Sequence, residues 1–385
     1  MNRLQPCFIA LICGAGGLSA PVPQQPAPST PYVKWTVKAD NNRTAMNVAL
    51  VVKELVVVGT ENGELQAYRT ADGKSIWTFE HGKRIAHRLS ADDERVYFTA
   101  ADGLVAVKAV DGKKEWSVEI DKGDGPVLAM KEKGVVYTAD NDGTIYSFDA
   151  KTGKKLWTAD FLADAPDDPP GFDGERARLA PAKARPSNLD CDGETVFLTV
   201  FDQCRVVAFE ASSGKRRWAF QTKGWVGGVQ LTATSVFLGS QDTFLYCLDK
   251  KTGKEIWKFG AKNSTDNGCV ADNQNVYFGT SAGNYYCLNQ KDGKEVWRFK
   301  TDGRIDGRNY WTGSRPILLK GTLWMTSHDG KFYGVAAASG KRLCMIQPDE
   351  EADLSSPITD GKSFFLTTRP HERLRGNSLV TISLK

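Results

Sequence analysis

The sequence predicts an all-β chain folded as an eight-bladed β-propeller, and three observations carry this prediction. A Gly-Lys turn motif recurs seven times along the 385 residues, and in six copies a tryptophan follows three residues after the lysine. The copies lie mostly about forty residues apart, and apolar and polar side chains alternate between them without a helical period. Each terminus carries an incomplete unit that the other terminus would complete. A ring of four-stranded units accounts for all three observations.

The motif consists of a glycine, a lysine directly after it and, in most copies, a tryptophan four positions after the glycine. The glycines are Gly73, Gly112, Gly153, Gly214, Gly253, Gly293 and Gly340. The tryptophans are Trp77, Trp116, Trp157, Trp218, Trp257 and Trp297, and Cys344 takes this position in the seventh copy. Because glycine tolerates positive φ in a tight turn, each copy predicts a hairpin between the last two strands of a blade.

The fifth unit illustrates how one repeat predicts four strands. Alternating runs at 236–240 and 244–249 flank a polar turn, and the run at 255–259 follows the Gly253 turn. A further apolar run at 229–231 precedes them. Four short antiparallel strands in forty residues, joined by tight turns, are typical of a propeller blade.

The two ends of the chain predict how the ring closes. The C-terminal segment supplies strand-like runs at 357–358, 364–368 and 379–383, but no Gly-Lys-x-x-Trp strand follows them. The run Val33–Val37 carries Trp35 and has no strand-like runs before it. We therefore expect this N-terminal strand to pair with the C-terminal blade, which removes exposed sheet edges. All seven outer-strand tryptophans, Trp35 included, are expected to wedge between blades.

The N-terminal residues predict export. Residues 1–20 combine Arg3, an apolar run at 8–12 and small residues at 14–17, which is typical of a signal peptide. Residues 21–32 form a Pro-rich linker, and residues 33–385 form the propeller. We expect ordinary cleavage, with a lipid anchor at Cys13 as the alternative. The protein is therefore placed in the periplasm or cell envelope, tethered to a membrane if Cys13 is lipidated, and no other segment predicts a membrane span.

Composition and motifs exclude several classes of function. The chain has 50 Lys and Arg against 46 Asp and Glu, and this net charge of +4 gives no electrostatic case for nucleic-acid binding. The eight cysteines show no CxxC spacing, the four histidines show no metal-ligand spacing, and no GxSxG motif is present. We therefore assign no catalytic residue, metal or cofactor, and we expect a monomer.

Two turn sequences carry a resemblance to a known family. Residues 149–157 (DAKTGKKLW) and 249–257 (DKKTGKEIW) resemble the tryptophan-docking repeat of quinoprotein dehydrogenases and related PQQ-like-repeat propellers, over about residues 33–385. The chain is also similar in length to propeller lipoproteins of the outer-membrane β-barrel assembly machinery. The resemblance implies either a non-catalytic scaffold or recognition platform, or a dehydrogenase that uses PQQ and Ca²⁺. The chain lacks the adjacent cysteines and the ligand-bearing insertion of the dehydrogenases, so we expect the scaffold.

Candidate binding residues lie in the blade-to-blade connections, on the face opposite the Gly-Lys turns. An insertion at 160–186 is acidic in its first half and basic in its second half, and a smaller expansion spans 302–315. The candidates are Arg185, Trp225, Arg308, Tyr310, Trp311 and Arg315. Aromatic rings beside arginines bind planar or sugar ligands or anchor protein loops, and the alternative for these residues is packing over the channel rim. We therefore expect another envelope protein, or a peptide or carbohydrate ligand, at the channel face.

Overall fold

The repeated hairpin is the local unit of the fold. The glycines of the seven turns have φ between 68° and 73°, a region in which a side chain is strained. Each turn pairs the last two strands of a sheet in antiparallel register, as where Cys247 lies opposite Trp257. The hairpin thereby places the tryptophan on the outermost strand of its sheet.

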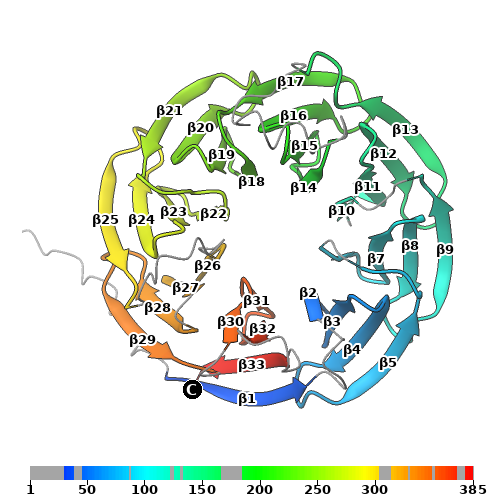
Figure 1. Cartoon of the computed structure of the whole chain (residues 1–385), viewed down its shortest axis with the longest axis horizontal. Coiled ribbons are helices and arrows are strands. Elements are labelled where there is room, and N and C mark those ends of the chain that lie inside the picture. Colours follow the sequence, from blue (N-terminus) through cyan, green and yellow to red (C-terminus); the bar gives the residue numbers. More distant parts are fainter. Residues whose placement is uncertain are drawn as a thin grey trace, which may run out of the picture.

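The computed structural model describes residues 30–38, 46–85, 88–121, 125–130, 133–165, 184–302, 314–327, 330–348, 352–370 and 378–384. Over these residues the strands form eight antiparallel sheets that surround a common centre (Figure 1). Each sheet is one blade, with its first strand toward the centre and its last strand on the rim.

Seven blades use four consecutive strands, which we number as blades 1 to 7. Blades 1 to 4 contain β2 (Met46–Val52), β3 (Leu55–Thr60), β4 (Glu64–Arg69) and β5 (Ser75–Glu80); β6 (Ser90–Ala91), β7 (Arg95–Ala100), β8 (Gly103–Lys108) and β9 (Lys114–Glu119); β10 (Val127–Met130), β11 (Val135–Ala139), β12 (Thr144–Asp149) and β13 (Lys155–Asp160); and β14 (Pro186–Cys191), β15 (Thr195–Val200), β16 (Arg205–Glu210) and β17 (Arg216–Gln221). Blades 5 to 7 contain β18 (Val226–Leu231), β19 (Ser235–Ser240), β20 (Phe244–Asp249) and β21 (Glu255–Gly260); β22 (Cys269–Ala271), β23 (Asn275–Gly279), β24 (Asn284–Asn289) and β25 (Glu295–Lys300); and β26 (Ile317–Leu319), β27 (Thr322–Thr326), β28 (Phe332–Ala336) and β29 (Arg342–Ile346).

Blade 8 joins the two ends of the chain. Its strands are β30 (Ala352–Leu354), β31 (Ile358–Thr359), β32 (Ser363–Pro370), β33 (Ser378–Leu384) and β1 (Pro31–Lys38). The pairing of β1 with β33 runs from Pro31 opposite Leu384 to Lys38 opposite Ser378, with one irregularity near Trp35. In Figure 1 the dark blue β1 lies alongside the red β33. The predicted eight blades and the predicted closure by the N-terminal strand are both confirmed.

The apolar core lies between neighbouring blades. The second strands are the most deeply buried, and every residue of β7, β15 and β19 is buried. One core cluster joins Phe197 and Trp218 of blade 4 to Leu238 and Tyr246 of blade 5, and similar clusters fill other boundaries. Because each blade buries its faces only against its neighbours, the ring is held together boundary by boundary.

Each outer-strand tryptophan contacts the Gly-Lys turn of the next blade. A Cβ placed on Gly214 would lie only 2.5 Å from the Trp157 ring, so the indole packs directly against the glycine. Trp157 Nε1 also donates a hydrogen bond of 3.0 Å to the carbonyl of Ala211, three residues before that glycine. We call this pair of contacts a dock. The seven docks are Trp35–Gly73, Trp77–Gly112, Trp116–Gly153, Trp157–Gly214, Trp218–Gly253, Trp257–Gly293 and Trp297–Gly340, with indole hydrogen bonds of 2.8 to 3.1 Å.

The boundary between blades 7 and 8 is built differently. Cys344 of β29 holds the tryptophan position, and no turn joins the last two strands of blade 8, because the described ends of β33 and β1 meet there. An aromatic cluster fills the boundary instead. Trp324 lies 5.4 Å from Phe332 and 5.0 Å from Phe364, measured between ring centroids. The sequence therefore lacks the tryptophan at the one boundary where a receiving turn cannot form.

Candidate binding site in the central channel

The inner strands of five neighbouring blades line a cavity of about 640 Å³ on the channel side of the ring. Blades 1, 2, 6, 7 and 8 supply its described wall. The lining residues are Ala49, Leu50, Arg88, Leu89, Val270, Arg315, Pro316, Ile317, Leu318, Ser355, Ser356, Pro357, Ile358 and Thr359. Apolar side chains make up most of this wall, and the only charged groups among these residues are two guanidinium groups.

Arg315 is held in place by three neighbouring blades. Its backbone N–H donates to Ser356 Oγ of blade 8 at 3.1 Å. Its Nε donates to the carbonyl of Cys269 in blade 6 at 3.2 Å, and Nη2 donates to Gln230 Oε1 of blade 5 at 3.1 Å. Gln230 in turn donates its amide N–H to the carbonyl of Leu231, which directs its oxygen toward the arginine. The guanidinium group of Arg315 is therefore fixed before any ligand arrives.

Arg88 lies two residues before the short inner strand β6 and lines the same cavity. Its side chain is exposed to the solvent of the channel, although protein surrounds it. Desolvation, followed by repulsion from Arg315, lowers the pKa of Arg88 to about 10, which leaves it a cation at neutral pH. The described residues give Arg88 no hydrogen bond or ion pair.

Asp190 of β14 brings one negative charge to this region. Burial raises the pKa of its carboxyl group, whereas Arg315, the backbone N–H of Cys191 and Arg88 act in the opposite direction. The backbone N–H of Cys191 donates to Asp190 Oδ1 at 3.0 Å. Among the described residues, one carboxylate thus partly offsets two arginines, and the charge of these three groups together remains positive.

Two other predicted residues both contact Phe201: Arg185 from the connection between blades 3 and 4, and Trp225 from the connection between blades 4 and 5. Phe201 links them, because its N–H donates to the carbonyl of Arg185 at 2.9 Å and its ring centroid lies 4.3 Å from that of Trp225. The backbone N–H of Arg185 donates to Asp202 Oδ1 at 2.8 Å, and burial raises the pKa of that carboxyl group. Among the described lining residues of the cavity neither Arg185 nor Trp225 appears, so Arg315 is separate from this pair.

The remaining predicted residues lie outside the described part of the chain. These are Arg308, Tyr310 and Trp311, together with residues 166–183 of the predicted insertion. The start of the insertion is described, and it contacts the rim of blade 4. Arg216 of β17 donates to the carbonyl of Ala163 and forms an ion pair with Asp164 at 3.0 Å.

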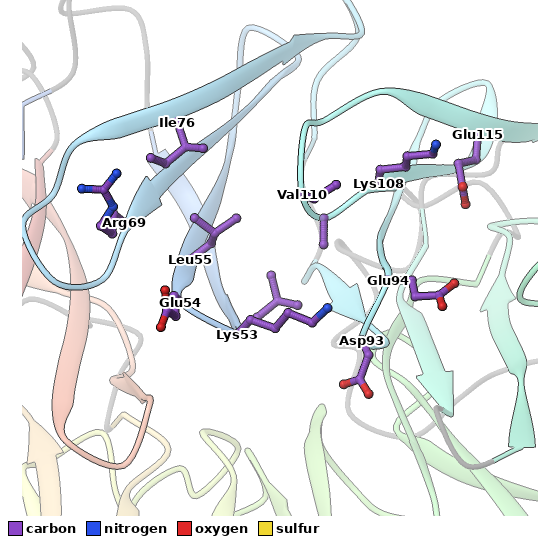
Figure 2. A pocket seen from close by; sticks show the side chains of 12 residues that line it. Lys53, Glu54, Leu55, Arg69, Ile76, Asp93, Glu94, Lys108, Val110 and Glu115 are labelled. Atoms are coloured by element: carbon purple, nitrogen blue, oxygen red, sulfur yellow. The ribbon is translucent and has the colours of Figure 1, made fainter.

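A groove of about 640 Å³ lies between blades 1 and 2, on the face of the Gly-Lys turns (Figure 2). Ile76 and Val110, which are 40 and 75% exposed, give it an apolar floor between charged side chains. A groove between blades 4 and 5 holds Arg217 and Lys251 at the equivalent places, three residues after and two residues before the turn glycine. The two grooves lie at equivalent places in the repeat, but one has apolar and the other basic side chains there. They are therefore not a repeated binding site.

Three further features bear on function. Among the described residues, no group of three or more His, Cys, Asp or Glu side chains is placed to hold a metal ion. The same residues include no helix long and apolar enough to cross a membrane. Six cysteines fall in the described ranges, and all six are free thiols.

A family model described as "Outer membrane protein assembly factor BamB" matches residues 32–259 and 241–368. The chain belongs to this family. BamB of Burkholderia pseudomallei is 24% identical over 354 residues, which cover 87% of this chain and 85% of that protein. The crystal structure of BamB from Moraxella catarrhalis is 15% identical, with a TM-score of 0.69, and the match covers 93% of this chain and 98% of that chain. This structural likeness shows the shared propeller fold.

Enzymes also match part of this chain in sequence. Lupanine 17-hydroxylase [cytochrome c] of a Pseudomonas species is 26% identical over 44% of this chain, and the dehydrogenase subunit of alcohol dehydrogenase (quinone) from Gluconobacter oxydans is 26% identical over 58%. The matches span only 26% and 33% of the lengths of those two enzymes. The predicted resemblance to PQQ-like-repeat propellers is thereby confirmed.

Sequence reasoning selected Arg315 but missed Arg88 and Asp190. A signal for Arg88 is present in the sequence, because Arg88, Arg185 and Arg315 each stand one or two residues before the innermost strand of a blade. Asp190 lies inside an inner strand and carries no motif. Only the closed ring shows that residues 88, 190 and 315 share the channel.

Proposed function

We propose that this chain is a non-catalytic, protein-binding scaffold that serves in outer membrane protein assembly. The observation that carries the proposal is coverage. In sequence, the match to the Burkholderia BamB spans 85% of that protein, whereas the sequence matches to the two enzymes span a third of their lengths or less. The shared part of the enzymes is the propeller repeat, which serves binding proteins and enzymes alike.

The connection face is the surface that we propose for the partner. Trp225 packs against Phe201 beside the exposed Arg185, and aromatic and arginine side chains of this kind anchor many protein interfaces. The proposal includes export through residues 1–20, a linker at 21–32, and a monomeric propeller. Lipid attachment at Cys13 is the alternative to ordinary cleavage, and the intact mass of the mature protein separates the two.

The test is a strain that lacks this chain. We expect lower amounts of outer membrane β-barrel proteins in its envelope fraction, restored by the full-length chain with its own N-terminus. A photoreactive amino acid at position 225 should cross-link to a protein of the assembly machinery, whereas the same group at Lys154, on the opposite face, should not. Unchanged outer membrane proteins, together with dye reduction by the purified chain on addition of PQQ and Ca²⁺, would establish the dehydrogenase instead.

A further inference from the structure

We propose that the central cavity binds a carboxylate carried on an apolar body, with Arg88 and Arg315 holding the carboxylate. This site is separate from the connection-face surface proposed for the partner protein, and it does not depend on that function. Four features of the described residues support it.

The first feature is an unpartnered cation. Arg88 lines the cavity, and no hydrogen bond or ion pair joins it to another described residue. A guanidinium group carries five N–H donors in a fork that matches the two oxygens of a carboxylate. Surface arginines commonly lack partners, but Arg88 lies in the channel, where desolvation lowers its pKa.

The second feature is a preorganised partner for Arg88. The hydrogen bonds from Arg315 to Cys269 and Gln230 use Nε and Nη2 and leave Nη1 without a partner among the described residues. Gly268 lies against the side chain, since a Cβ at that glycine would be 3.4 Å from Arg315 Cδ. A side chain held in this way loses little conformational freedom when a ligand binds.

The third feature is the charge balance. Arg88 and Arg315 repel each other across the cavity, and Asp190 offsets only one of the two positive charges. An incoming anion relieves this repulsion and makes charge-assisted hydrogen bonds at the same time. Replacing Asp190 by a neutral side chain of the same shape should therefore strengthen anion binding.

The fourth feature is the apolar wall of the cavity, which favours a ligand whose uncharged part is also apolar. Leu50, Leu89, Val270 and Ile317 line the cavity with few polar groups, and its volume of about 640 Å³ falls within the range of small-molecule sites. A phosphate or sulfate ion would leave this apolar surface in contact with water. An aliphatic or aromatic carboxylate would cover it.

Two sources can supply such a ligand, namely a small organic acid and the C-terminal end of a polypeptide. The experiment is calorimetric titration of the full-length mature chain with three probes: hexanoate, the peptide acetyl-Ala-Val-Leu with a free carboxylate, and the same peptide as its C-terminal amide. Binding of the peptide acid, with the amide at least tenfold weaker, supports a polypeptide end. Binding of hexanoate alone supports a small organic acid. No binding of either acid, or equal binding of acid and amide, overturns the proposal.

Matched variants locate the site. Arg88→Gln should weaken binding about tenfold or more, because it removes a charge-assisted hydrogen bond. This variant should fold normally, since Arg88 makes no hydrogen bond or ion pair with the described residues, and an unchanged melting temperature checks this. Arg185→Gln is the control, because Arg185 occupies the same place before an inner strand but does not line the cavity. Asp190→Asn should tighten binding several-fold. Equal affinity in Arg88→Gln and the unmodified chain would overturn the proposal.

Discussion

Seven of the eight boundaries between blades each contain a dock, and the boundary between blades 7 and 8 does not. At the seven, an indole packs against a glycine turn and donates a hydrogen bond to the first residue of the same turn. At the boundary between blades 7 and 8, aromatic rings of β27, β28 and β32 fill the space instead. A dock needs both a tryptophan and a covalent turn to receive it. The comparison teaches that the repeat encodes a contact between blades and not the blade alone.

The largest expected effect comes from removing the strand that closes the ring. Deletion of residues 1–38 should remove β1, expose the edge of β33 and abolish the dock on Gly73. We expect loss of most of the free energy of unfolding, which is roughly 5 to 15 kcal/mol for a typical domain. Chemical denaturation followed by circular dichroism measures it. Deletion of residues 1–29 alone is the control, and equal midpoints for the two deletions would contradict the role of β1.

A single dock should contribute several kcal/mol. Trp157→Ala removes a large ring and its hydrogen bond to Ala211, and we expect destabilisation by about 3 to 5 kcal/mol. The matched change at the other kind of boundary is Cys344→Ala, which removes only a small side chain and should cost about 1 kcal/mol. Urea titration of both variants measures the difference. Similar losses of stability in the two variants would mean that Trp157 contributes no more to its boundary than Cys344 contributes to the boundary between blades 7 and 8.

Substitutions at two glycines distinguish the energetic cost of disturbing a dock from the cost of straining a turn. Gly214 and Gly361 both have positive φ, of 73° and 84°, but a Cβ would meet the Trp157 ring at Gly214 and nothing within 4 Å at Gly361. Gly361→Ala should therefore cost about 1 kcal/mol, from backbone strain alone. Gly214→Ala should cost about 1 to 3 kcal/mol more, because the ring must move. Thermal unfolding at matched protein concentration gives the comparison. Equal losses of stability would show that the Trp157 ring can move away from the new methyl group without cost.

The smallest effect concerns the indole N–H groups. Trp297 Nε1 donates to the carbonyl of Ala337 at 2.8 Å, whereas the buried Nε1 of Trp324 has no protein partner in the described residues. Trp297→Phe should cost about 1 kcal/mol more than Trp324→Phe, because only the first change breaks a hydrogen bond. Denaturation midpoints of the two variants measure this difference. A larger loss from Trp324→Phe would show that its packing outweighs the hydrogen bond.

The sequence contains most of the fold because the repeat marks every outer hairpin. The spacing of the turn glycines and the isolated strand around Trp35 together predict eight blades and the way in which they close. The inner strands carry no such mark, and β6 is only two residues long. For that reason Arg315 was identified from its surroundings in the sequence, whereas Arg88 and Asp190 required the ring. Their proximity results from closure, which brings distant parts of the chain around one axis.

The pairing of β1 with β33 also constrains the order of folding. Pro31 and Leu384 are partners although nearly the whole chain separates them, so the pairing carries a high contact order. Because the chain is made from its N-terminus, β1 has no pairing partner until β33, the last strand, is available. The ring is therefore complete only when β33, the last strand of the chain, is available to pair with β1.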